Sequence, residues 1–557
     1  MYTKKKLFTH RNLIIILFIV FLFLRLFTDS PSILLGADNL KFMQAAKSFP
    51  YHKLYNNQLY LLHPPFYPYA IYFANLFFDE DYIAALFISL ISSIVIFFLI
   101  YHFFMMLTDN FNITFIILVF YTLSVGFIHS AKVPSKDLFL VMLIMLSIYY
   151  YIKAVKFDNK KSLIVASIFG AILALSSDHI VFLFPAFVLS YIFFNFRKIN
   201  LKKFKFPNIK YALLPLIIIS IFYGSWNAVK FYEYSANKYY PNGVEGAPLS
   251  TKDFGLLHLI NPYYFEDWED AYIQSGAISV IKRVIFQMGY MFDLEPFSIP
   301  PGLNLTTMKF LLGPEHIVYM FLIYFPLALL ALLGFLSIIK DFIRTKKIYE
   351  NANLYMTGLF FVFLIPLTQQ ILSPRYIFTS YIFLFYFISY GIFILLMKRR
   401  ITKAYAKIIP MMAMLLLLLI PFWYYNNGHF ILFNKKVVAA QKTANFINSN
   451  LDKEDAIMAQ QGYNIKLIYL TGHRMVGLYP KPEKLLDVIY YYDIKYVIFG
   501  RVYTSYFGLF STDSVEFIRN KPDKFELVAT IPEDYSDFYV EGDPKRTDEV
   551  YVYKVKR

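Results

Sequence analysis

Long uncharged apolar runs alternate with short basic clusters along the first three quarters of the chain. Several of these runs reach the roughly 17–25 residues that cross a bilayer as a helix. The pattern predicts about eleven spans, at 12–27, 83–107, 113–128, 138–155, 162–175, 180–196, 211–226, 317–339, 354–367, 376–397 and 408–423. We therefore predict a polytopic α-helical membrane protein.

The basic clusters indicate how the chain is threaded. They lie at 4–11, 153–161, 197–210, 340–347 and 398–407. Lys and Arg concentrate on the cytoplasmic side, so an even number of spans should separate successive clusters. The span assignment meets this condition, with a cytoplasmic N-terminus, if the segment 65–78 does not cross.

That segment reads "PFYPYAIYFANLFF" and is followed by Asp79, Glu80 and Asp81. Prolines, aromatic residues and flanking acids favour a short helix lying in the outer interface of the membrane. The alternative is that the segment crosses, which would put the basic clusters on opposite sides.

The chain changes character after residue 433. Helix-like stretches ("KVVAAQKTANFINSNL", "PEKLLDVIYYY") alternate there with strand-like ones ("DAIMAQ", "KYVIFG", "FELVATI", "VYVYKV"). The apolar runs shorten to the length of a soluble core. We predict a transmembrane domain over 1–433, with outer loops at 29–82 and 227–315, and a small extracytoplasmic α/β domain over 434–557.

Composition supports this assignment and excludes other classes. Hydrophobic residues make up 58% of the 557 residues, which is more than a soluble protein can bury. The net charge of +16 is accounted for by cytoplasmic clusters facing membrane lipids, so no nucleic-acid partner is expected. With no cysteine, disulfides and thiolate metal sites are excluded.

Ionisable residues gather at the turns predicted to face outward. These residues are Asp29, Asp38 and His63 in the first loop, Lys132, Lys136 and Asp137 in "HSAKVPSKD", Asp178 and His179 between the fifth and sixth spans, and Arg375 between the ninth and tenth. Each alone is explained by solvation or by a helix end, as for Asp137 at the start of its span. As a set they favour a functional cavity, because charges at a membrane edge are costly unless paired or wetted.

Four stretches together resemble the GT-C class of membrane glycosyltransferases. They are "GADNLKF" after the first span, "HPPFYPYAIYF", "HSAKVPSKDLFLVMLIMLSIYYYIKA" after the third span, and "SPRYIF" at a late span. The likeness is to the dolichyl-phosphate-mannose protein mannosyltransferase and aminoarabinose transferase type (glycosyltransferase family 39) and covers about 12–397. The oligosaccharyltransferase branch fits less well, because its Trp-Trp-Asp signature is missing.

The resemblance implies transfer of a sugar from a polyprenyl-phosphate donor to a hydroxyl of a protein, lipid or glycan, with interface helices in the first loop. It makes Asp38 the acid that engages the acceptor, Asp137 a second acid, and Arg375 a cation near the donor phosphate. The chemistry agrees, because a carboxylate can take the acceptor proton while cations such as Lys132 and Lys136 stabilise the leaving phosphate. Direct displacement implies inversion at the anomeric carbon.

Some alternatives remain open. Asp29 is the fallback for Asp38, and His63, Asp178 and His179 are candidate substrate contacts. No cofactor is expected, although Asp178 and His179 could bind a divalent metal together with the two acids. A secondary transporter would show two similar halves, and no repeat is visible. The third alternative is a scaffold whose outer domain carries the function.

Overall fold

The fold is given by a computed structural model. It describes residues 10–26, 37–51, 64–78, 80–134, 136–177, 180, 183–195, 209–236, 313–345, 352–364, 378–398, 441–459, 467, 470–473, 475–478, 482–500, 512–533 and 548–556. The eleventh predicted span and most of the predicted outer loop 227–315 lie outside these residues.

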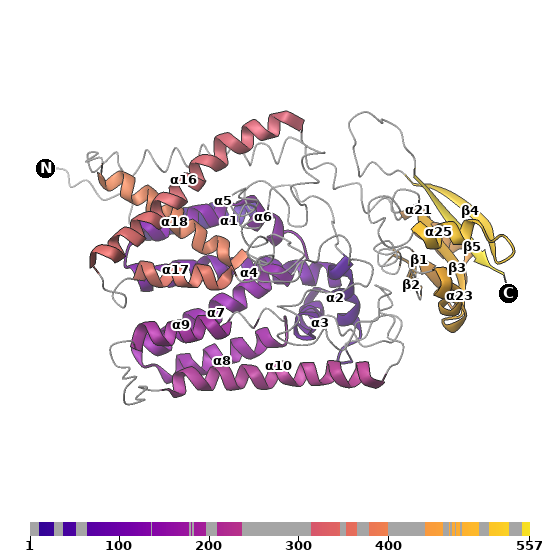
Figure 1. The fold of residues 1–557 in the computed structure, drawn as a ribbon, viewed down its shortest axis with the longest axis horizontal. Helices are drawn as coiled ribbons and strands as arrows, with labels where there is room; N and C mark the ends of the chain where they lie inside the picture. Colours follow the sequence, from indigo (N-terminus) through magenta and orange to yellow (C-terminus); the bar gives the residue numbers. More distant parts are fainter. Residues whose placement is uncertain are drawn as a thin grey trace. The chain divides into compact units, whose positions relative to one another are not determined.

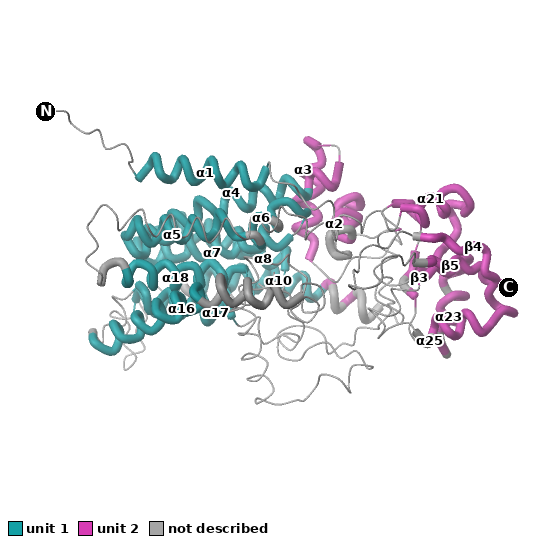
Figure 2. The backbone as a smooth tube through the Cα atoms, turned by 90° about the horizontal axis from the view of Figure 1, so that it is seen from above, with its two compact units in different colours: residues 1–29, 85–228, 255–428 teal, residues 30–84, 229–254, 429–557 magenta. Residues whose placement is uncertain are grey.

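The chain divides into two compact units, coloured separately in Figure 2. The first contains residues 1–29, 85–228 and 255–428, and the second contains 30–84, 229–254 and 429–557. The predicted domain boundary after residue 433 stays a prediction. Each unit is described below by itself.

The first unit is helical (Figure 1). Its helices are α1 (His10–Leu26), α4 (Asp81–Thr108, of which the first turn belongs to the second unit), α5 (Phe111–Leu123), α6 (Val125–Ala131), α7 (Lys136–Phe157), α8 (Lys160–Ala174), α9 (Leu183–Asn195), α10 (Lys210–Ala236, which belongs to the second unit from Val229 on), α16 (Gly313–Thr345), α17 (Ala352–Phe363) and α18 (Phe378–Lys398). Each of the first ten predicted spans coincides with one of these helices, with one exception.

The exception is the predicted span 113–128, which is wrong as a single helix. The chain forms α5 and then α6, separated by Ser124 in an extended conformation (φ −64°, ψ 117°). Apolar composition continues through the break, so hydropathy alone could not reveal it. The break is fixed by tertiary contacts described below.

Four helices in the described part of the chain are long and apolar enough to cross a membrane. These are Asp81–Thr108, Lys136–Phe157, Pro326–Arg344 and Phe378–Leu395. Shorter apolar helices lie at Phe111–Leu123, Leu183–Asn195, Leu213–Val229 and Ala352–Phe363. The number of spans therefore remains a prediction.

Glycines permit a close contact between two helices of this unit. α16 packs against α18, and a Cβ built on Gly334 would overlap the carbonyl oxygen of Phe387. A Cβ on Gly391 would overlap the carbonyl oxygen of Leu330 in the same way. Small residues allow two backbones to approach to a distance that any side chain would prevent.

The second unit includes two helices of the first predicted loop. α2 (Ala37–Lys47) packs against α3 (Phe66–Phe78), with the rings of Phe42 and Tyr67 edge to face at 5.2 Å. α3 is the helix expected at 65–78, and its side chains Phe73, Leu76 and Phe77 are exposed. Its place in the membrane interface stays a prediction. α2 shows no clear apolar period and was not predicted from its own residues.

The C-terminal part of this unit contains a sheet of β1 (Ala456–Ala459), β2 (Met475–Gly477), β3 (Ile494–Gly500), β4 (Phe525–Glu533) and β5 (Asp548–Val555), in the order β2-β1-β3-β5-β4. β2, β1 and β3 are parallel, and β5 is antiparallel to both of its neighbours. The helices α21 (Gln441–Asn450), α23 (Pro482–Tyr491) and α25 (Thr512–Arg519) accompany it (Figure 1).

Both faces of this sheet are covered. Ile457 and Ala459 pack in one apolar cluster with α21, whereas Ala456 and Met458 pack in the other with α23 and α25. The α/β segment predicted from the sequence is therefore present, with four strands found near their predicted positions. β2 and α25 were missed, because each has too few apolar residues to form a recognisable pattern.

Candidate active site

Three charged residues are buried where α6 leads into α7. The exposed fractions are 5% for Lys132, 7% for Lys136 and 6% for Asp137. Lys and Asp are almost never this deeply buried unless they are paired, and none of the three lacks an interaction partner. The sequence placed these residues at an outer turn, and in the structure all three are buried.

The break between α5 and α6 determines the path of this segment. The Ser124 N–H still bonds the Phe120 carbonyl at 2.9 Å, and the Ile128 N–H then bonds the Ser124 carbonyl at 2.9 Å. α6 therefore restarts with a new direction after a single extended residue. α7 begins with Lys136 and Asp137. A carboxylate in the first turn of a helix stabilises the helix, because the N–H groups there carry partial positive charge.

The carbonyls left open at the end of α5 are bound by Arg25 from α1. The guanidinium donates from Nη1 to the Thr122 carbonyl and from Nη2 to the Tyr121 carbonyl, both at 3.2 Å. Its Nε donates to Ser93 Oγ at 2.8 Å. Because the last carbonyls of a helix have no partner within the helix, Arg25 acts as a side-chain cap for α5.

Arg25 is only 3% exposed, and its charge lies 3.8 Å from the centre of the Phe21 ring. No carboxylate in the described part of the chain forms an ion pair with it. Carbonyl dipoles, a hydroxyl and aromatic faces therefore stabilise the cation. Sequence reasoning missed this residue because it considered clusters of charge, although one Arg in the last turn of an otherwise uncharged span was a usable signal.

α2 carries the predicted catalytic acid. Asp38 is the second residue of α2, and its side chain lies outside what the structure describes. Further along the helix, Lys41 and Gln44 are buried. Asp38 belongs to the second compact unit and the cluster at the start of α7 belongs to the first. The catalytic role of Asp38 accordingly stays a prediction.

Aromatic contacts of Phe49, which follows α2 in the chain, hold this helix against α3. The ring of Phe49 stacks on Tyr72 at 4.3 Å and meets Tyr69 edge on at 5.0 Å. The Tyr69 hydroxyl donates to the Pro50 carbonyl at 2.8 Å. Burial raises the pKa of Tyr69, so this phenol remains a proton donor at physiological pH. These contacts hold the end of α2 against α3.

The remaining site predictions lie outside the described residues. They concern Arg375, His63, Asp178, His179 and the fallback acid Asp29. Within the described residues, no group of three or more His, Cys, Asp or Glu side chains is arranged to hold a metal ion. Both the metal-free site and the substrate contacts stay predictions.

Comparison with known proteins supports the class to which the sequence points. Residues 62–225 match the family model for dolichyl-phosphate-mannose-protein mannosyltransferase. This match covers the segment from α3 into α10, and therefore includes the buried cluster at the start of α7. No curated protein sequence matches the chain.

The fold is similar to two solved membrane enzymes. The oligosaccharyltransferase of Archaeoglobus fulgidus in complex with Zn and sulfate is 12% identical, with a TM-score of 0.52 over 90% of this chain and 70% of that chain. ArnT from Cupriavidus metallidurans in the apo state is 10% identical, with a TM-score of 0.51 over 97% of both chains. ArnT bound to undecaprenyl phosphate is 12% identical, with a TM-score of 0.50 over 98% of this chain and 97% of that chain.

Identities this low show the fold alone. The family match over residues 62–225 supports the GT-C glycosyltransferase class, and the structural similarities agree with the predicted helical membrane fold with a small C-terminal sheet.

Proposed function

We propose that this chain is a membrane glycosyltransferase that moves a sugar from a polyprenyl-phosphate donor to a hydroxyl acceptor. The observation that carries the proposal is the buried cluster of Lys132, Lys136 and Asp137, which lies within the segment that matches the mannosyltransferase family. Two buried ammonium groups provide positive charge where the leaving phosphate would develop negative charge. Such charge acts strongly in a site with little water.

The reaction needs one base and no strong acid. The acceptor oxygen attacks the anomeric carbon while the bond from that carbon to the phosphate oxygen breaks, and polyprenyl phosphate leaves with the electron pair. The acceptor proton passes to the carboxylate of Asp38. Asp137 is the second acid, and Arg375 adds a planar cation that can bind two phosphate oxygens. A single displacement inverts the anomeric configuration.

The location of the reaction follows from the charge pattern. We place the site at the outer face of the cell membrane, with the N-terminus in the cytoplasm and the domain 434–557 outside. The bound undecaprenyl phosphate in the ArnT structure supports a lipid-linked donor. The acceptor is a hydroxyl on a protein, a lipid or a glycan, and no metal or other cofactor takes part.

Donor consumption tests this function. The purified full chain, reconstituted in vesicles, is incubated with radiolabelled polyprenyl-phosphate mannose or aminoarabinose and with extracts of membrane proteins, lipids and glycans. The expected result is acceptor-dependent release of polyprenyl phosphate with label on one acceptor class. If no acceptor takes label from any donor, while a known transferase works in the same vesicles, the proposal is wrong.

A further inference from the structure

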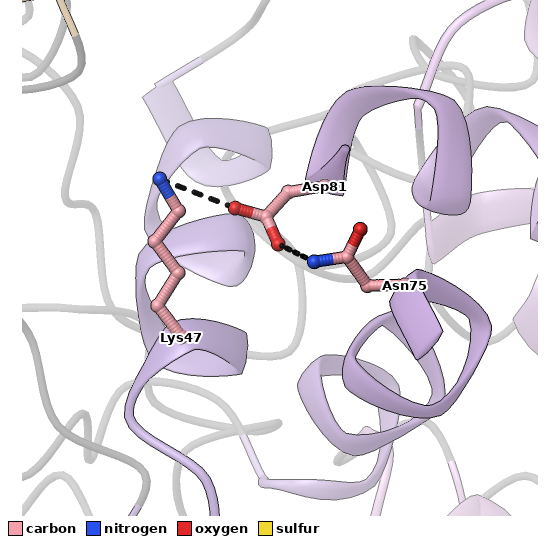
Figure 3. A network of polar contacts seen from close by, with 3 residues as sticks. All are labelled: Lys47, Asn75 and Asp81. Carbon is pink, nitrogen blue, oxygen red and sulfur yellow. Dashed lines mark hydrogen bonds and ion pairs between the residues drawn. The ribbon is translucent and has the colours of Figure 1, made fainter. Parts of the chain in front are cut away.

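One buried carboxylate joins the three helices around the first loop. Asp81, the first residue of α4, is 7% exposed, and its Oδ2 lies 3.3 Å from Nζ of Lys47 at the end of α2. Its Oδ1 accepts a hydrogen bond of 2.9 Å from Nδ2 of Asn75 in α3. Figure 3 shows the carboxylate of Asp81 between the ammonium and the amide.

The two partners of Asp81 bind it in different ways. Lys47 is 52% exposed, so the ion pair is partly screened by water and weak as a source of stability. Asn75 is half-buried, and its Oδ1 is buried without a partner among the residues that the structure describes. Its contact with the carboxylate is therefore the interaction that fixes this amide.

The network contacts α2 at the end of the helix that is opposite to Asp38. α2 has 11 residues, which corresponds to a length of about 16 Å. Lys47 is at its last position and Asp38 at its second, so the network holds the end opposite to the predicted base. The rings of Phe49, Tyr69 and Tyr72 also restrain this end of α2, since stacked and edge-to-face ring pairs have preferred geometries. The ion pair of Lys47 links α2 to the carboxylate at the start of α4, and the hydrogen bond from Asn75 links α3, on which α2 packs, to the same carboxylate. Together these contacts restrict the tilt of α2.

We propose that Asp81 is a positioning residue for glycosyl transfer, acting through Lys47 and Asn75 to set the orientation of α2 and hence of Asp38. This inference rests on the proposed function. It predicts that weakening the network slows the chemical step while donor binding is retained, since both oxygens of the Asp81 carboxylate are engaged by Lys47 and Asn75.

Turnover of the full chain in vesicles provides the first test. Asp81→Asn keeps the size of the side chain and removes its charge, and Lys47→Met removes the partner charge at an exposed position that folding tolerates. A misplacement of about 1 Å can cost on the order of 100-fold in rate. Each variant is expected to lower kcat about tenfold or more, with the KM for the donor within about twofold.

A double variant distinguishes a shared network from two separate effects. Lys47→Met with Asp81→Asn should be no slower than the slower single variant, because both changes remove the same interaction. Lys495→Met is the matched control: it removes an ion pair of 3.2 Å with Asp493 in the C-terminal sheet region and should leave turnover unchanged. Additive losses in the double variant, or wild-type kcat in both single variants, would overturn the proposal.

A second measurement does not depend on transfer activity. The chain has no cysteine, so Ala45→Cys introduces a single thiol at a position of α2 that is fully buried. In this background, Asp81→Asn and Lys47→Met should raise the rate of maleimide labelling by about two- to fivefold, because an ion pair worth up to about 1 kcal/mol is lost and local opening exposes buried groups. An unchanged labelling rate would show that Lys47 and Asp81 do not hold α2 in place, and this conclusion holds even if the wild-type protein transfers no sugar. Faster labelling with unchanged kcat overturns the positioning role alone.

Discussion

Replacing Arg25 by Met tests whether one buried cation holds the helix break that leads to the charged cluster. The substitution keeps an unbranched chain of comparable reach and removes all donors to Ser93, Tyr121 and Thr122. Ser93 Oγ retains a contact of 2.9 Å with the Tyr121 hydroxyl, so its hydroxyl is not left alone. The carbonyls of Tyr121 and Thr122 lose the guanidinium that donates to them.

The expected cost follows from these two carbonyls. A buried acceptor left without a donor costs about 1–3 kcal/mol, so two cost about 2–6 kcal/mol. Part of this is recovered, because the folded state no longer has to bury a guanidinium. We expect a net loss of about 2–4 kcal/mol in the free energy of unfolding, which is large compared with an ordinary surface substitution.

Thermal stability in detergent measures this loss, with monodisperse protein quantified by size-exclusion chromatography after heating. Arg25→Lys should be at least as damaging as Arg25→Met, because one ammonium cannot reach two carbonyls and a hydroxyl as a planar fork does. Ser225→Ala, which removes an exposed bond to the Ile221 carbonyl, should be close to wild type. Full stability of Arg25→Lys would show that charge alone matters and would refute the capping argument.

Three further predictions concern other parts of the chain. Gly391→Ala should lower the free energy of unfolding by about 1–3 kcal/mol, because its Cβ would overlap the Leu330 carbonyl. Gly224→Ala has open space around it and should leave stability unchanged, and thermal unfolding measures both. Arg375→Ala should slow donor turnover tens- to hundredfold and Arg375→Lys less, since charged hydrogen bonds contribute about 1.5–3 kcal/mol, and wild-type rates would exclude a phosphate role. Reporter fusions should report cytoplasm after Lys210, Lys347 and Lys407 and the exterior after Asn434, and an external signal after Lys210 would break the predicted threading.

The positions of the helices could be predicted because hydropathy is a local property. An apolar run of sufficient length must be helical in a membrane, whatever its neighbours are. The helix α7, for example, begins and ends within two residues of the predicted span 138–155. A helix that does not cross at 65–78 was expected from counting charges, because a crossing there would reverse the positive-inside pattern, and the structure has the helix α3 at this position. Its place in the membrane interface stays a prediction.

The details that shape the candidate site depend on partners far away in sequence. The break at Ser124 follows an apolar run without any local signal, and Arg25 caps the helix that ends there from almost 100 residues earlier. α2 is held by packing against α3 rather than by an apolar stripe of its own. The sequence indicated that Lys132 and Asp137 were unusual, but their burial depends on tertiary packing.

The central claim is that a carboxylate in the first loop is the base for glycosyl transfer. Asp38→Asn keeps the size of the side chain but cannot accept the proton of the attacking hydroxyl. Loss of a general base costs about 10²–10⁴-fold, whereas loss of a helix cap costs only about 0.5–2 kcal/mol of stability. Asp29→Asn and Asp137→Asn, expressed at matched levels, serve as comparisons.

The decisive measurement is therefore the rate of donor turnover by Asp38→Asn in vesicles, with correct insertion verified by the reporter after Asn434. The account predicts a protein that inserts normally and turns over the donor at least about 100-fold more slowly than wild type. An inactive Asp29→Asn beside a fully active Asp38→Asn would move the base to Asp29. If Asp38→Asn, Asp29→Asn and Asp137→Asn all transfer sugar at the wild-type rate, the first loop is not a glycosyl-transfer site and the account is contradicted.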